Sequence, residues 1–146
     1  MDSFQKNVQI NLRTTIDDGG AKEYSDQIQS GNYFRKQEMD VLMFEEKLDD
    51  DSVVKNLITI QESKVHINRS GAVKMNQKFE TGRISENIYH HPHGKIHMET
   101  FTETIDYQKS TKSKEGRLAI SYTVKLNGQD KRNHKIELSY KEEDHQ

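Results

Sequence analysis

The feature that most constrains this chain is an alternation of apolar and polar residues with a period of two. In residues 116–128, GRLAISYTVKLNG, one face carries Leu118, Ile120, Tyr122, Val124 and Leu126. Successive side chains of a β-strand point to opposite faces of a sheet, so this pattern predicts a strand with one buried face. The Asn127-Gly128 pair that follows favours a tight hairpin turn, because both residues tolerate a positive φ.

The same alternation recurs along most of the chain, in segments separated by short turns rich in Gly, Asn and Asp. It is found at residues 8–16, 52–60, 63–71, 72–80, 83–89, 95–107 and 134–141. No segment reads as a helical crossover that could join parallel strands, so the pattern predicts about eight to ten antiparallel strands. Residues 37–48, QEMDVLMFEEKL, fit either a strand or a short amphipathic helix, and the strand is favoured.

Many sequential antiparallel strands leave exposed sheet edges unless the sheet closes on itself. A barrel of about eight strands has room inside for side chains or for one small ligand, which suits a chain with only 31% hydrophobic residues. We therefore predict an all-β fold, a closed antiparallel up-and-down β-barrel, with a β-sandwich as the alternative. The length of 146 residues predicts one domain over residues 1–146, with a frayed tail from about residue 142 to 146.

Several classes of function and location are disfavoured by what the sequence lacks. The absence of cysteine excludes disulfides and thiolate chemistry. No apolar run approaches the roughly 20 residues of a membrane helix, and the first residues do not resemble a signal peptide, so we expect a cytoplasmic protein without a membrane partner. The basic clusters at 109–114 and 131–135 flank one strand at its two ends, which argues against a nucleic-acid surface.

Three segments, in this order and spacing, resemble a family of uncharacterised bacterial proteins typified by YwiB. They are RSGAVKM at 69–75, YHHPHGKIHMETFT at 89–102 and GRLAISYTVKLNG at 116–128. The resemblance implies a calycin-like, lipocalin-related β-barrel in a bacterial cytosol, and it implies no activity. Tyr89, Pro92 and Gly94 match the turn of the family pattern, whereas His91 and His93 replace a Thr or Ser and an aromatic residue.

The turn segment also raises the question of a metal site, because it holds four of the seven histidines. In an extended chain His91, His93 and His97 share a face and would provide three imidazole ligands for a zinc hydrolase at residues 90–97, next to His90. Pro92 and Gly94 bend the chain, however, and favour a plain surface hairpin. We predict no cofactor and no metal site.

The candidate ligand-binding residues are inward-facing polar or aromatic side chains: Arg69, Gln77, Tyr89, Tyr122 and Tyr140. Arg69 is either an anchor for an anionic group or, more simply, the partner of Glu45 or Glu46. The favoured hypothesis is a non-catalytic protein that binds a small, partly apolar ligand in the barrel interior. One alternative is a structural or protein-interaction module with a filled barrel, which could form a homodimer. The other alternative is the histidine-based hydrolase.

Overall fold

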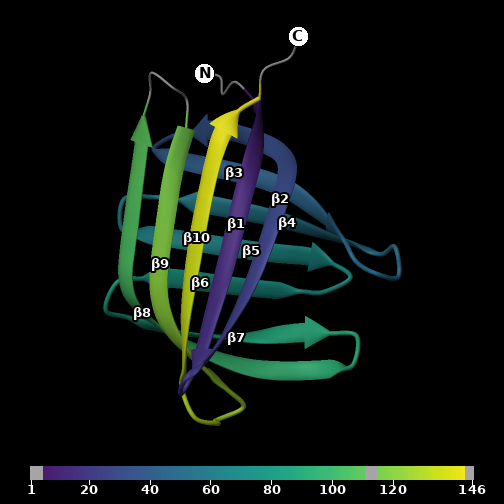
Figure 1. Ribbon diagram of the computed structural model, residues 1–146, viewed down its shortest axis with the longest axis vertical. Coiled ribbons are helices and arrows are strands. Elements are labelled where there is room, and N and C mark those ends of the chain that lie inside the picture. The colour runs from purple at the N-terminus through teal and green to yellow at the C-terminus, as the bar shows by residue number, and fades with distance from the viewer. Residues whose placement is uncertain (1–4, 111–114, 144–146) are drawn as a thin grey trace.

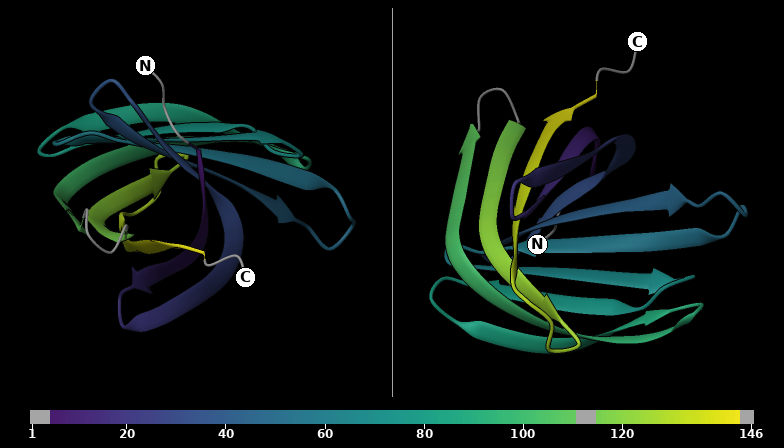
Figure 2. Two further views of the ribbon diagram at one scale, coloured as in Figure 1. Left: turned by 90° about the horizontal axis from the view of Figure 1, so that it is seen from above. Right: turned by 60° about the horizontal axis from the view of Figure 1, so that its bottom comes forward.

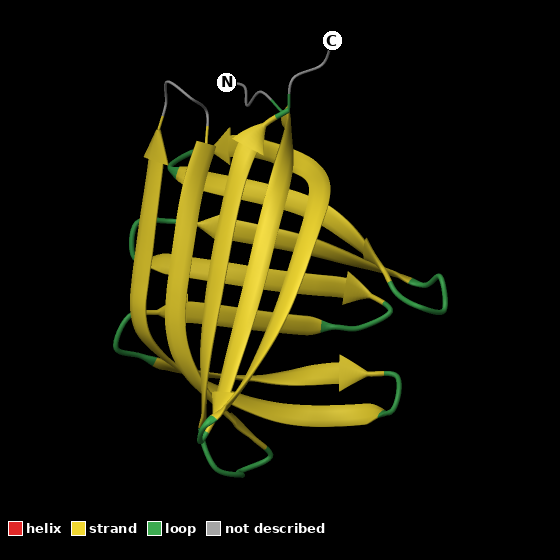
Figure 3. Cartoon of the chain, viewed as in Figure 1, coloured by secondary structure: helices red, strands yellow, loops and turns green. Residues whose placement is uncertain are grey.

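The computed structural model describes residues 5–110 and 115–143, and these residues form strands and turns without any helix (Figure 3). The strands are β1 Lys6–Asp18, β2 Ala21–Lys36, β3 Met39–Lys47, β4 Val53–Ile60, β5 Lys64–Gly71, β6 Met75–Glu80, β7 Ile84–His91, β8 Gly94–Ser110, β9 Glu115–Leu126 and β10 Arg132–Glu142. Each predicted segment is a strand, and residues 37–48 contain β3 rather than a helix. The last three residues of the predicted frayed tail, 144–146, lie outside the described part.

All neighbouring strands are antiparallel and follow the order β6-β5-β4-β3-β2-β1-β10-β9-β8-β7. The pair β1 and β10 joins strands from opposite ends of the sequence, and Val8 lies opposite Glu142. One layer contains β1, β9, β10 and parts of β2 and β8, while β3 to β7 cross behind it (Figures 1 and 2). The prediction of an all-β antiparallel barrel is therefore confirmed. Among the described residues there is no helix long and apolar enough to cross a membrane.

Two long strands, β2 and β8, belong to both layers. Each has a local irregularity, a glycine in β2 and a β-bulge in β8. β2 pairs with β1 as far as Tyr33 and with β3 from Gly31 onward. A Cβ on Gly31 would lie 2.5 Å from the carbonyl oxygen of Met43 and 2.8 Å from Cδ1 of Ile10. Glycine at this corner therefore lets three strands approach closely. In β8 the pairing with β9 shifts between Thr102 and Thr104, and such a β-bulge bends the strand.

Inward-facing side chains of both layers form one apolar core. Its most buried members include Val8, Ile10, Leu42, Ile60, Val65, Phe79, Leu118, Ile120 and Val124. The rings of Phe79 and Tyr122 meet edge to face with centroids 4.8 Å apart, and their residues are only 1% and 4% exposed. The ring of His134 lies 5.2 Å from that of Tyr122, and its burial lowers the pKa of His134 to about 4. Aromatic side chains thus fill this part of the interior.

The sheet closes where β6 meets β7, and this seam, residues 74–80 facing 84–90, has sparse backbone pairing. In the described chain its bridge joins Lys74 and His90, whose amide nitrogens and carbonyl oxygens pair at 3.0 and 2.8 Å. Beyond the bridge, Nδ2 of Asn87 donates to the carbonyl of Asn76 at 2.7 Å. Oγ of Ser85 donates to the carbonyl of Lys78 at 3.1 Å. Side chains of β7 therefore satisfy carbonyls of β6 that a continuous backbone ladder would otherwise use.

A disulfide across the seam is expected to stabilise the barrel. Lys74 and His90 are a hydrogen-bonded antiparallel pair, so their Cα atoms should be about 5.5 Å apart, within the range of a disulfide. Closing a loop of about 15 residues should raise the free energy of unfolding by about 3 kcal/mol in Lys74→Cys/His90→Cys. Urea unfolding of the oxidised and reduced forms measures this difference.

The wild-type chain is the control for the reductant, because it has no cysteine of its own. Native-state hydrogen exchange adds a local test of the seam. Amides of β6 and β7 should exchange faster than those of β9 and β10 in the wild type, and the oxidised variant should slow them. Equal protection of the two strand pairs in the wild type would contradict the weak seam.

Candidate functional site

A buried carboxylate, that of Asp40, lies near the start of β3 and beside the last residues of β8. Its side chain is 3% exposed, and both of its oxygens accept hydrogen bonds. Oδ1 accepts from the Tyr33 hydroxyl at 2.7 Å and from Nη1 of Arg35 at 2.9 Å. Oδ2 accepts from the Tyr107 hydroxyl at 2.7 Å and from Nζ of Lys109 at 3.0 Å. We call Asp40 and these four partners the Asp40 network.

Strand geometry explains why a charged residue is inside the barrel. Asp40 shares the inward face of β3 with Leu42 and Phe44, because alternate residues of a strand point the same way. Tyr107 and Lys109 alternate in the same manner near the end of β8. The network thus joins β2, β3 and β8, and it ties the last part of β8 to the beginning of β3.

Tyr140 of β10 extends the network. Its hydroxyl oxygen lies 2.6 Å from that of Tyr107, and its ring stacks on that of Tyr33 with centroids 5.3 Å apart. Gly116 of β9 makes room for the ring, since a Cβ at that position would come within 2.6 Å of it. Because the Tyr107 hydroxyl donates to Asp40, it accepts the hydrogen of Tyr140.

The protonation states follow from these contacts. Burial alone would raise the pKa of Asp40, but hydrogen bonds from Tyr33, Tyr107 and Lys109 outweigh it and hold that pKa below its usual value. Burial and the neighbouring carboxylate raise the pKa of Tyr33 and of Tyr107 well above 10. Burial raises the pKa of Tyr140 to about 12. At neutral pH the carboxylate is therefore ionised and the three phenols are protonated.

A cavity of about 150 Å³ adjoins the Asp40 network on the side of Tyr33 and Tyr140. Val8 and the two tyrosine rings give it apolar walls, and its remaining lining residues are Lys6, Lys109, Ser110 and Glu115. A wider depression of about 720 Å³ reaches Asp40 beside Arg35, Tyr107 and Lys109. The Asp40 network thus borders two hollows, of which the smaller has aromatic walls.

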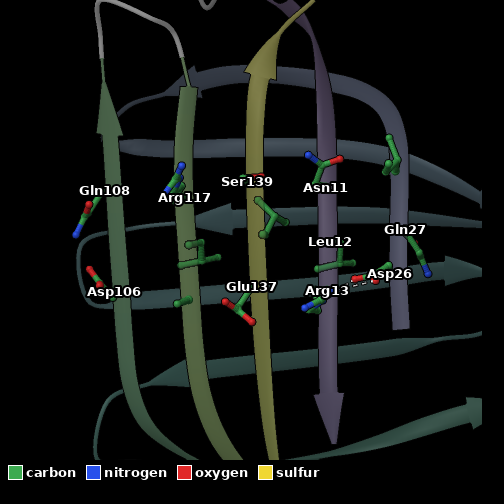
Figure 4. A pocket seen from close by; sticks show the side chains of 14 residues that line it. Asn11, Leu12, Arg13, Asp26, Gln27, Asp106, Gln108, Arg117, Glu137 and Ser139 are labelled. Atoms are coloured by element: carbon green, nitrogen blue, oxygen red, sulfur yellow. Dashed lines mark hydrogen bonds and ion pairs between the residues drawn. The ribbon is translucent and has the colours of Figure 1, made fainter. Parts of the chain in front are cut away.

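A groove on the outer face of the barrel is shown in Figure 4. It has a volume of about 710 Å³ and crosses β8, β9, β10, β1 and β2. Nε of Arg13 donates to Asp26 at 2.8 Å, and both side chains are more than half exposed. Exposed ion pairs of this kind are worth about 1 kcal/mol or less. The groove is a solvated polar face, so the cavity beside Asp40 is the better candidate.

The prediction that Arg69 pairs with Glu45 or Glu46 is confirmed for Glu46, whose Oε1 lies 3.2 Å from Nη2 of Arg69. Asn56 and Gln27 also donate to the Glu46 carboxylate, at 2.8 and 3.1 Å. This arrangement corresponds to the structural interpretation of Arg69. Its alternative role as an anion anchor stays a prediction.

The five predicted ligand-binding residues do not converge on one site. Nε2 of Gln77 donates to the Thr100 hydroxyl at 2.9 Å in the buried interior, and Tyr122 belongs to the core beside Phe79. The ring of Tyr89 lies against His91 at the turn between β7 and β8. Of the five, Tyr140 lines the cavity beside Asp40. A ligand role for the other four stays a prediction.

The histidines of the turn do not form the three-ligand set considered above. His91 has the parity of Tyr89 on the half-buried face of β7, whereas His97 lies opposite the exposed Ile88. These two rings therefore project from opposite faces of the sheet, and Nε2 of His97 lies 3.2 Å from Glu86. Across the described residues no group of three or more His, Cys, Asp or Glu side chains is placed to hold a metal ion. The interpretation as a hairpin is favoured by this geometry.

Exposed apolar residues cluster on the outer face of β7 and β8. Ile84 is 61% exposed and pairs across the strands with Phe101, and Ile88 lies two rows further along. Scattered surface apolar residues are normal in monomeric proteins, and three of them do not define an interface. An interaction module, and a homodimer in particular, stays a prediction.

Sequence reasoning did not identify Asp40, although a signal was present. Asp40 and Glu46 both have the parity of Leu42 and Phe44, so the strand interpretation of residues 37–48 places two carboxylates among inward apolar side chains. A buried carboxylate needs cationic or hydrogen-bonding partners. Inward-facing carboxylates such as these are therefore expected to be surrounded by other polar side chains. The partners Tyr107 and Lys109 are distant in sequence and could not be found by local pattern.

The fold and the site together define a class: an antiparallel β-barrel protein with a buried carboxylate network at one end. The chain belongs to the family described as a domain of unknown function, DUF1934, which matches residues 10–138. It is 29% identical over 133 residues to the uncharacterized beta-barrel protein YwiB of Bacillus subtilis (strain 168), covering 91% of this chain and 92% of that protein.

The structure is also similar to a crystal structure of the ywiB protein from Bacillus subtilis. The TM-score is 0.83 at 27% sequence identity, over 96% of this chain and 94% of that one. These similarities confirm the resemblance inferred from the three sequence segments and the β-barrel that it implied. A relation to calycins and lipocalins stays a prediction.

Proposed function

We propose that this protein is a non-catalytic binding protein for a small, partly apolar molecule held in the cavity beside Asp40. The observation that carries the proposal is that the cavity has aromatic walls, Tyr33 and Tyr140, which stack on each other and connect through hydroxyl groups to a buried carboxylate. Such walls are fixed before a ligand arrives, and a preformed site loses less entropy on binding.

The size of the cavity limits the ligand. A cavity of about 150 Å³ in another protein accommodates benzene. The apolar surfaces of Val8 and the two tyrosine rings suit a body of that size, either one ring or a short branched chain. The lysine, serine and glutamate side chains that complete the lining would meet a polar substituent.

The ionisation of the site favours binding over catalysis. A general acid or base is most effective when its pKa is near the working pH. The pKa of Asp40 is held low by its hydrogen bonds, and those of Tyr33 and Tyr107 are raised by burial. At neutral pH these groups therefore keep their protonation states and serve as fixed walls and supports.

Filling the cavity tests the proposal. Val8→Phe places a ring where the ligand would lie, and Val53→Phe is the matched control, because Val53 is 39% exposed on β4. We expect small aromatic probes, namely benzoate, benzamide, benzyl alcohol and benzylamine, to perturb the amide resonances of residues 8, 33 and 140 in two-dimensional NMR spectra. At least one probe should bind the wild type and Val53→Phe, and bind Val8→Phe at least about tenfold more weakly.

Native mass spectrometry of gently purified protein provides an independent test. A mass that is lost on denaturation would identify a resident ligand directly. If no probe perturbs the cavity residues, or if Val8→Phe folds and still binds as tightly as Val53→Phe, the cavity is not the binding site. Circular dichroism of both variants verifies that they fold.

A further inference from the structure

We propose that the ligand of this cavity carries a carboxylate, seated between the ammonium groups of Lys6 and Lys109. This inference rests on the proposed binding function and specifies the chemical class of the ligand. Of the charged residues that line the cavity in the described chain, Lys6 and Lys109 are cationic and Glu115 is anionic. The lining therefore favours a negative group.

The hydroxyl hydrogens of the site are already engaged. Tyr33 and Tyr107 donate to Asp40, and the Tyr140 hydroxyl donates to that of Tyr107. The phenols can therefore offer a ligand only their oxygen lone pairs, and a ligand acceptor must be met by a different donor. Lysine has three donor hydrogens, and the ammonium groups of Lys6 and Lys109 are the cationic donors at this cavity.

The charge of Lys109 is only partly neutralised within the network. Asp40 accepts from Lys109 at 3.0 Å but also from Arg35 at 2.9 Å, so one carboxylate is shared by two cations. Nζ of Lys6 lies 4.0 Å from the nearest oxygen of Glu142, a separation longer than a hydrogen bond. A carboxylate bound between Lys6 and Lys109 would add a further anion beside these cations and form charge-assisted hydrogen bonds with them.

The apolar part of the ligand has a defined place beside these cations. Val8 and the stacked rings of Tyr33 and Tyr140 line the same cavity as Lys6 and Lys109, and Lys6 pairs with Tyr33 across β1 and β2. The class that fits is a small aromatic or branched aliphatic carboxylate. Benzoate is the probe of this class, and benzamide has nearly the same shape without the charge.

The test compares the two probes on the wild-type protein and on variants of Lys6. Benzoate should bind the wild type at least about tenfold more tightly than benzamide. Lys6→Met should weaken benzoate about three- to tenfold and leave benzamide unchanged, and Lys6→Arg should restore benzoate because it keeps the charge. Lys141→Met is the control, since Lys141 is exposed on the neighbouring strand β10. NMR titration of the cavity amides gives the dissociation constants.

The outcomes separate this inference from the function on which it rests. If benzamide or benzylamine binds as tightly as benzoate, and Val8→Phe abolishes that binding, the carboxylate class is wrong and the cavity remains a binding site. Loss of the benzoate preference in Lys141→Met as much as in Lys6→Met would also overturn the placement between Lys6 and Lys109. If none of the probes binds, the proposed function itself fails.

Discussion

Replacing Asp40 by alanine is expected to lower the free energy of unfolding by about 3 kcal/mol. The substitution leaves Lys109 and Arg35 close together without their shared anion, and it removes the acceptor of the Tyr33 and Tyr107 hydroxyls. Removing one partner of a buried charged network costs roughly 3–5 kcal/mol, and the partial exposure of both cations places this case at the lower end. Urea denaturation measures the loss.

The control for this change is Asp106→Ala on the outer face of β8, which should alter stability by less than about 0.5 kcal/mol. The ring of Tyr140 should also become mobile in Asp40→Ala, because its hydroxyl bonds to Tyr107. Line broadening of the Tyr140 ring signals would report this. If Asp40→Ala were as stable as Asp106→Ala, the Asp40 network would not contribute to the free energy of unfolding.

The Asp40 prediction includes a pH dependence. The pKa of Asp40 is lowered in the folded protein, so its contribution is present above the unfolded pKa of about 4 and is lost as pH falls through the folded pKa. The pKa of His134 is also lowered by folding, to about 4, so stability falls between about pH 6.5 and 4 through that residue. The wild type and Asp40→Ala should both lose stability through His134 as the pH falls. Below about pH 4 the wild type should lose more stability than Asp40→Ala, and the remaining loss in Asp40→Ala arises from other carboxyls with a lowered pKa, such as Asp26 and Asp50.

Replacing Gly31 by alanine is expected to cost about 3 kcal/mol or to prevent folding. The added methyl group would lie 2.5 Å from the backbone oxygen of Met43, which cannot move without disturbing the pairing of β2 with β3. The backbone of Gly31 does not have a positive φ, so the cost arises from lack of space and not from backbone strain. Overpacking at such a site usually costs about 1–3 kcal/mol, and a backbone clash is more severe than a side-chain clash.

Two controls separate this effect from a general effect of substitution in β2. Ser25→Ala, at an exposed position of the same strand, should change the free energy of unfolding by less than about 0.5 kcal/mol. Gly116→Ala should be intermediate, because the atoms in its way belong to the ring of Tyr140, which can rotate away. A Gly31→Ala protein with wild-type stability would mean that the corner of β2 relaxes freely. Thermal and urea unfolding provide the comparison.

Much of the fold could be predicted because the alternation of apolar and polar residues directly indicates strands and their buried faces. The face of β9 that contains Leu118, Ile120 and Tyr122 is buried as the pattern required, and the turn at Asn127 and Gly128 has positive φ at both residues. β2 was not predicted as a separate strand. Its first half is largely exposed on both faces, so that Lys22 to Ser30 show little apolar alternation. Its pairing with β1 and β3 specifies this strand, and local sequence does not reveal it.

The candidate site was less predictable than the fold for a physical reason. Tyr140 was identified because it alternates with Leu138 on an inward face, a local property. The Asp40 network instead depends on which strands meet at one end of the barrel. Asp40 and Lys109 come together only when β3 and β8 belong to different layers of the same closed sheet. Apolar periodicity identifies the inner face of a strand, but it does not identify the residue across the interior.

The pairing of β1 with β10 has a consequence for how the chain reaches its structure. Every other neighbouring pair in the sheet is consecutive in sequence, so the hairpins of β1 to β6 and then those of β7 to β9 can form one after another as a ribosome releases the chain. β1, however, keeps one edge of unsatisfied amides and carbonyls until β10 emerges. Completion of the barrel is therefore a late event, and throughout its synthesis the nascent protein presents a template on which a strand of another chain can mispair.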